Sequence, residues 1–374
     1  MIVHTTTAEP PETDPQSVDL RPLSQLAPDQ PTHLATDSVG NIYWVQESPV
    51  GQDLLFVAGQ DDIPQPTQLT TNAILAAFGP APSPPARPGP SAAESSSGSG
   101  NIESIAIDGD DNVLFFFNGG IGRSTRVCLG RFNPRDQSIR ILAGTQILAT
   151  ASRMGSSIGL AQGQIIRPTA ARPDQPMRYW LWLHHSDAAV FFQFDPRAVD
   201  PGQPIELSRA FDHLSGDGAP DHLSADLLEF SAGTDQGLLM IDWREAWLWR
   251  VDESGVATKW MTLLGLPRHL SELTARPGGI VVAFAAAGER AVGDGDGQSM
   301  IGAHSLQVQY PALLGFEGDQ VIPIAAMDDI HGPAELDVAK LDFRIFLPTS
   351  TKHQWVGYDA ASGVLMRVQL TPKS

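Results

Sequence analysis

Four residues of this sequence carry metal-binding side chains at one recurring position, directly before an apolar, strand-like segment. They are His33, Glu229, Glu272 and Glu335. Carboxylate oxygens and an imidazole nitrogen are ligands for divalent cations such as Ca²⁺, Mn²⁺ or Zn²⁺. If folding brings these side chains together, the carboxylates repel one another unless a cation, water or a proton neutralises them. The four residues are therefore a candidate metal or ligand site, with a water-filled opening that binds nothing as the alternative.

Other polar residues lie at or near equivalent positions. Ser104 precedes a second such segment, and Ser157 precedes a third, less regular one. The acidic and imidazole side chains close to these positions are Glu103, Asp226, His269 and His331. Nothing in this set identifies a nucleophile or a general base, so no catalytic residue is assigned.

Three motifs are better explained by local structure than by chemistry. Residues 155–159 match the G-x-S-x-G pattern, but a nucleophile elbow needs a strand that turns into a helix, and we expect a Ser/Gly-rich strand start. Residues 108–112 resemble a calcium loop without its glycine and final carboxylate, so we expect a hairpin turn. His184 and His185 are neighbours on an expected strand and point to opposite faces, so they cannot chelate one ion. No phosphate loop or dinucleotide motif is present, so no cofactor is expected beyond the possible divalent cation.

The elements that must position these residues are short hairpins. Segments 34–45 and 105–116 share an apolar strand, a turn rich in Asp, Gly and Asn, and a second strand of β-branched and aromatic residues. Weaker copies occupy 230–241 and 273–284. A second kind of hairpin begins downstream of these, at 54–57, 130–133, 192–195, 249–252, 315–317 and 357–359.

Four strands that recur every 40 to 70 residues, roughly, are typical of a β-propeller blade. We therefore expect an all-β, six-bladed β-propeller of four-stranded antiparallel blades. The first strand of each blade lines the central channel of a propeller, which places the candidate residues at one channel mouth. An irregular β-sandwich or two stacked all-β domains are the alternatives.

The sequence predicts one folded domain with two biased segments. We expect a disordered tail over 1–17, a single propeller domain over 18–374, and a disordered Pro/Ser/Gly-rich insertion loop over 79–100. Propellers often complete their last blade with a strand from the other end of the chain, which removes an exposed edge. Segment 18–23 is the best candidate, and we expect it to pair with 364–368.

Composition restricts the partners. The 374 residues include 24 basic and 43 acidic ones, for a net charge of −19. Such a surface repels phosphate backbones and anionic lipids, so we expect no nucleic acid and no membrane partner, although solubility alone also explains the charge. Cys128 is the one cysteine, so no internal disulfide forms. No apolar stretch is long enough to span a membrane and no signal peptide is visible, which predicts a cytoplasmic protein.

The hairpins at 34–45 and 105–116 resemble the NHL repeat and the six-bladed propellers of the gluconolactonase (SMP-30-like) group. Those repeats carry an apolar strand, an Asp, a Gly-Asn turn and then Ile-Tyr-Val. The resemblance implies a propeller and, for the gluconolactonase-like enzymes, a divalent cation held at the channel mouth by Glu, Asn and Asp. The aligned positions of this chain contain no Asn.

Two functions follow as hypotheses, and whether the protein is an enzyme stays open. The first is a non-catalytic binding or scaffold propeller, whose protein or small-molecule ligand docks at the channel mouth or on one face. The alternative is a divalent-metal-dependent lactonase or related hydrolase, in which metal-bound water attacks an ester carbonyl. The missing Asn, the long insertions and the lack of a general base favour the binding propeller.

Overall fold

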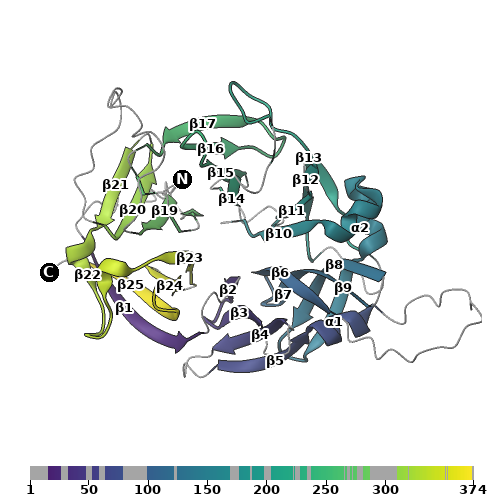
Figure 1. The fold of residues 1–374 in the computed structure, drawn as a ribbon, viewed down its shortest axis with the longest axis horizontal. Helices are drawn as coiled ribbons and strands as arrows, with labels where there is room; N and C mark the ends of the chain where they lie inside the picture. The colour runs from purple at the N-terminus through teal and green to yellow at the C-terminus, as the bar shows by residue number, and fades with distance from the viewer. Residues whose placement is uncertain are drawn as a thin grey trace, which may run out of the picture.

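The computed structural model describes the chain between residues 16 and 372, apart from several gaps. The residues outside the description are 1–15, 27–32, 48–52, 59–63, 79–98, 122–123, 169–176, 186–187, 198–203, 222, 224–227, 234–236, 265, 268–269, 272, 276–280, 287–309, 319, 350, 352 and 373–374. In the described part, six β-sheets form a ring (Figure 1).

Five of these sheets have four antiparallel strands in sequence order. Sheet I contains β2 (Leu34–Thr36), β3 (Ile42–Glu47), β4 (Asp53–Ala58) and β5 (Pro64–Thr70). Sheet II contains β6 (Ser99–Ile107), β7 (Val113–Ile121), β8 (Ser124–Asn133) and β9 (Ser138–Ala143). Sheet III contains β10 (Gln162–Ile166), β11 (Tyr179–His185), β12 (Ala188–Phe194) and β13 (Ser208–Phe211). Sheet IV contains β14 (Leu228–Ala232), β15 (Leu238–Asp242), β16 (Trp247–Val251) and β17 (Ala257–Thr262), and sheet V contains β18 (Thr274–Ala275), β19 (Val281–Ala285), β20 (Ala312–Glu317) and β21 (Gln320–Ala325).

The remaining sheet, here called the closing sheet, joins the two ends of the chain. Its order is β23 (Phe343–Pro348), β24 (Gln354–Asp359), β25 (Val364–Pro372), β1 (Gln16–Gln25) and β22 (Ile330–His331). β1 pairs with β25 in antiparallel fashion, with Leu20 opposite Val368, and with β22 in parallel fashion. This confirms the predicted pairing of 18–23 with 364–368.

The all-β propeller architecture and the four-stranded antiparallel blades are confirmed for sheets I to V. The expectation of six four-stranded blades is met only in part, because five sheets have four strands and the closing sheet has five. The predicted domain limits also need adjustment. β1 begins at Gln16, inside the expected tail, and Ser99 and Gly100 belong to β6. The rest of the tail and of the insertion loop lies outside the described residues.

The hydrophobic core is divided into six clusters, and each fills the space between two neighbouring sheets. The central strands are apolar on both faces, as in β15, where every residue is buried. Large aromatic side chains anchor the layers: Trp44, Trp180, Trp249 and Trp355 are fully buried and come from four different sheets. Continuous burial on both faces explains why these strands lack the alternation of a half-exposed sheet.

Helices are short and peripheral. They are α1 (Thr71–Ala77), α2 (Thr145–Ser152) and the 3₁₀ turns η1 (Gly155–Leu160), η2 (Met327–Asp329) and η3 (Val338–Lys340). The expected strand start at 155–159 is therefore wrong, because these residues form η1. Arg153 and Gly155 adopt left-handed backbone conformations that reverse the chain after α2, and Ile158 is then buried against sheets II and III. No helix among the described residues is long and apolar enough to cross a membrane.

Candidate functional site

The inner strands of the ring define two opposite faces near its centre. The inner strands are β2, β6, β10, β14, β18 and β23, and each lies beside the next around the centre (Figure 1). Because each four-stranded sheet is antiparallel, its last strand ends on the side where the next inner strand begins. All inner strands therefore start on one side, here called the start face, and end on the other, the end face. The predicted channel mouth corresponds to the centre of the start face.

The structure places two of the four predicted metal residues on this start face. His33 directly precedes β2 and is half-buried, and Glu229 is the second residue of β14 with an exposed side chain. Glu272 lies outside the described residues. Glu335 lies between β22 and η3, beside the outer part of the closing sheet, so its predicted position before an inner strand is wrong.

The strand order of the closing sheet explains why Glu335 does not precede an inner strand. Segment 357–359 is the end of β24, the second strand from the centre, whereas the other hairpins of its kind begin at the third strand of their sheets. The fourth strand is supplied by β1, so the closing sheet begins one strand later in sequence than a self-contained blade would. Its inner strand is β23, and Asp342 is the residue that directly precedes it. Asp342 lies 3.6 Å from Arg344 Nε through its Oδ2 atom.

Glu229 is held by an indole on the start face. Its Oε1 accepts a hydrogen bond of 2.9 Å from Trp243 Nε1. Trp243 lies in the turn between β15 and β16, and the buried Asp242 closes this turn by accepting bonds from the backbone N–H groups of Arg244 and Glu245. The turn therefore places the Trp243 indole beside the Glu229 carboxylate, at the start of the inner strand β14 of the same sheet.

The His33 imidazole is neutral at physiological pH. Burial among its neighbours lowers its pKa to about 4, because a desolvated imidazolium is disfavoured. Its backbone carbonyl accepts a hydrogen bond of 3.2 Å from Val45 N, which fixes the start of β2 against β3. A neutral imidazole can donate one hydrogen bond and accept another, or bind a metal through its unprotonated nitrogen.

Ser104 and Glu103 have structural partners. The Ser104 hydroxyl oxygen accepts a hydrogen bond of 2.9 Å from Ile165 N, and Glu103 Oε2 accepts one of 3.0 Å from Gly163 N. Both bonds join the inner strand of sheet II to that of sheet III. The other polar residues predicted nearby do not join this group: Ser157 is exposed in η1, His331 is in β22, and Asp226 and His269 are outside the described residues.

The described residues do not fit a divalent-metal site. Among them, no three His, Cys, Asp or Glu side chains gather as metal ligands. Glu229 is bonded to Trp243, Glu103 to a backbone N–H group, and Asp342 lies beside Arg344. The predicted metal residues that the structure describes on the start face are therefore an exposed carboxylate, Glu229, and a neutral imidazole, His33, and they form no ligand cage.

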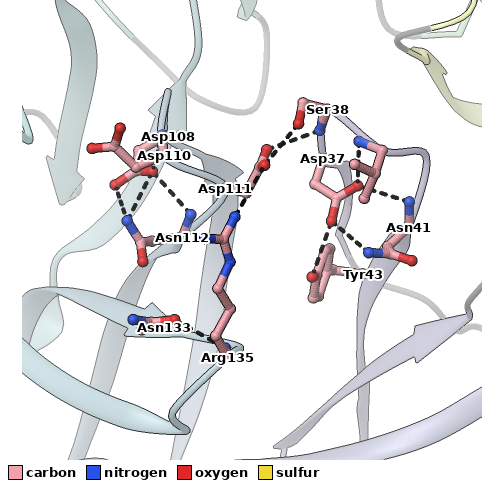
Figure 2. Close-up of polar contacts among 11 residues, drawn as sticks. Asp37, Ser38, Asn41, Tyr43, Asp108, Asp110, Asp111, Asn112, Asn133 and Arg135 are labelled. Atoms are coloured by element: carbon pink, nitrogen blue, oxygen red, sulfur yellow. Dashed lines mark hydrogen bonds and ion pairs between the residues drawn. The ribbon is translucent and has the colours of Figure 1, made fainter.

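The end face contains a polar network that is absent from the predicted site residues. Figure 2 shows its two centres, Asp37 and Asp108, which directly follow the inner strands β2 and β6. Asp37 accepts bonds from the backbone of Asn41 at 2.8 Å and its side chain at 2.7 Å, and Asp108 accepts the equivalent bonds from Asn112. In the sequence, the signal for this network is the repeated Asp-x-x-x-Asn spacing. The Asp and Asn residues close hairpin turns, as expected for 108–112.

The same network joins sheets. Asp111 accepts hydrogen bonds from the backbone N–H and the hydroxyl of Ser38, at 2.9 and 2.7 Å, and lies 4.0 Å from Arg135 (Figure 2). Asp110 is 3.9 Å from Arg197, which follows β12 in sheet III. Sheets I, II and III are therefore linked across the end face by charged and polar side chains.

No protein-family model and no curated protein matches this sequence. Solved structures match in fold. A Bacteroides thetaiotaomicron protein of unknown function aligns with a TM-score of 0.53 and 9% identity over 95% of this chain and 76% of the other. A gluconolactonase from Xanthomonas campestris aligns with a TM-score of 0.50 and 11% identity over 96% of this chain and 95% of the other. Virginiamycin B lyase from Staphylococcus aureus aligns with a TM-score of 0.45 and 11% identity over 95% of this chain and all of the other.

The first two alignments extend over nearly the whole chain and show a shared propeller fold. At this level of identity the likeness covers the fold alone, since one propeller architecture carries many activities. The resemblance to the NHL repeat stays a prediction.

Proposed function

We propose that this protein is a non-catalytic binding propeller whose ligand docks on the start face, around Glu229. One observation carries the proposal: the exposed Glu229 carboxylate is fixed at 2.9 Å from the Trp243 indole at the start of an inner strand. A carboxylate held in place loses little conformational freedom when a ligand binds it, which favours binding over a mobile surface charge.

The chemistry of this pair favours a cationic ligand. An exposed carboxylate can accept hydrogen bonds from an ammonium or guanidinium group, and the face of an indole attracts cations. The net charge of −19 adds long-range attraction for positive partners. The neutral His33 adds no competing positive charge to the start face.

The alternative is a metal-dependent lactonase or related hydrolase. The fold shared with a gluconolactonase is compatible with it at the level of architecture alone. The described residues assemble no metal-ligand group, and the start-face carboxylates Glu103 and Glu229 are bonded to protein groups. An experiment that can detect hydrolysis is therefore needed beside the binding test.

The test is a calorimetric titration of the full-length protein with spermidine as a cationic probe. We expect saturable binding that Glu229→Gln reduces at least tenfold. Glu245→Gln is the matched control, because Glu245 is exposed in the same turn as Trp243 and loses the same charge. Equal affinity in wild type and Glu229→Gln, or no saturable binding in either, would overturn the proposal.

The hydrolase alternative is tested on the same protein. Hydrolysis of a sugar lactone that depends on added Ca²⁺, Mn²⁺ or Zn²⁺, together with a rise in the melting temperature on adding that ion, would establish the enzyme instead. A bound ion stabilises the native state in proportion to its affinity, so a real site is visible in the melting temperature without any substrate.

A further inference from the structure

Arg167 occupies an unusual position on the end face. It directly follows the inner strand β10, as Asp37 follows β2 and Asp108 follows β6. In sheets I and II this residue is a buried aspartate that closes its own hairpin turn. In sheet III it is an exposed arginine, so the position that closes a turn elsewhere instead presents a guanidinium group to solvent.

The Arg167 side chain extends toward the centre of the ring. Its Nη1 atom lies 3.5 Å from the carbonyl oxygen of Thr36, at the end of β2. Sheet II stands between sheets I and III, because β6 neighbours both β2 and β10. The side chain therefore connects sheet III to sheet I, which are not neighbours in the ring. Its positive charge also acts on Tyr179, where it opposes the larger effect of burial, which raises the pKa of that phenol.

Arg167 differs in its partners from three other arginines of the end face. Arg131, Arg135 and Arg197 lie within 4.0 Å of Asp108, Asp111 and Asp110, respectively. Within the described residues, no carboxylate pairs with Arg167, and the Thr36 carbonyl at 3.5 Å is its one hydrogen-bond acceptor. The guanidinium group carries five N–H donors, and among the described residues most of these donors have no acceptor.

We propose that Arg167 is the anchor of an oxyanion-binding site at the centre of the end face. The ligand is a small molecule with a carboxylate or phosphate group, because a planar guanidinium fork matches two oxygens of either group. The net charge of −19 opposes anion binding over the whole surface, so the attraction at this site must come from the Arg167 guanidinium group itself. This site lies on the opposite face from Glu229 and does not depend on the function proposed there.

The test uses inorganic phosphate and acetate as separate probes, with the full-length protein at constant ionic strength set by chloride. We expect at least one probe to raise the melting temperature in a saturable way, since it binds the native state. The response should vanish in Arg167→Gln and persist in Arg135→Gln, an arginine of the same face that already has a carboxylate partner. Comparison of the two probes shows which oxyanion the site prefers.

Arg167→Lys keeps the positive charge and serves as a second test if Arg167→Gln does not fold. A lysine cannot form the two-pronged contact, so we expect this variant to fold and to bind the preferred probe at least fivefold more weakly than wild type. Absence of a saturable response in wild type, or an equal response in wild type and Arg167→Gln, would refute the site.

Discussion

The Ser38 hydroxyl donates a hydrogen bond of 2.7 Å to Asp111 Oδ2, although 73 positions separate the two residues. Ser38 is in the turn between β2 and β3, and Asp111 is in the turn between β6 and β7. Asp111 adopts a positive φ of 63°, which turns its carboxylate toward the neighbouring sheet. A polar contact therefore joins two blades in addition to the apolar layer between them.

The Ser38–Asp111 contact should be measurable as a coupling energy. We expect Ser38→Ala and Asp111→Asn to destabilise the protein individually and to show a coupling of about 0.5–1 kcal/mol in a double-mutant cycle, since the bond is charge-assisted but exposed. Asn is chosen because it tolerates the left-handed backbone at this position. Urea unfolding of the four proteins measures the coupling, and strictly additive effects would contradict it.

Asp108 should matter far more to stability than its neighbour Asp110. Asp108 is 1% exposed, and its carboxylate accepts bonds from the backbone N–H groups of Asp110 and Asn112. Asp108→Ala leaves these donors without an acceptor, so we expect a loss of about 1–3 kcal/mol in the free energy of unfolding. The Asp110 side chain is 62% exposed, and Asp110→Ala should cost less than about 0.5 kcal/mol. Similar losses for the two variants would count against the capping role.

Strand β1 should be essential for cooperative folding. It covers the edge of β25, and its Val18 and Leu20 side chains are buried between the closing sheet and sheet V. Deletion of residues 1–25 removes this strand and exposes a hydrogen-bonding edge, so we expect aggregation or loss of a single unfolding transition. Deletion of residues 1–15, which leaves β1 intact, is the control and should preserve the transition in circular dichroism.

His33 should contribute to acid sensitivity. Its folded-state pKa is lowered to about 4 from an ordinary value of 6.5, so the unfolded state binds more protons between these pH values. The contribution of His33 to native stability should therefore fall as the pH drops from 6.5 to 4 and stay constant below that range. The Gln side chain of His33→Gln cannot be protonated. We therefore expect the stability of this variant relative to wild type to increase as the pH falls from 6.5 to 4. A constant difference between the two proteins from pH 7 to pH 4 would show that His33 does not titrate in this way.

The local hairpins were predictable because their signals lie within about a dozen neighbouring residues. Segments 34–45 and 105–116 each contain an apolar strand, a turn rich in Asp, Gly and Asn, and a second strand of β-branched and aromatic residues. Both segments form the expected antiparallel pairs. Burial between neighbouring sheets follows from the same segments, since their strands are apolar on both faces. The pairing of 18–23 with the last strand followed from the need to cover an open edge.

The positions of the candidate site residues depended on the tertiary structure. The local pattern predicts Glu335 directly before an inner strand, whereas the inner strand of the closing sheet begins later, at Phe343, because β1 supplies one of its strands. The contact of Arg167 with Thr36 depends on the way three sheets pack around one centre. The sequence by itself determined hairpins, strands and propeller class, because these depend on interactions between near neighbours. Which side chains meet across the ring was decided by contacts between segments far apart in the chain, and no local pattern records these.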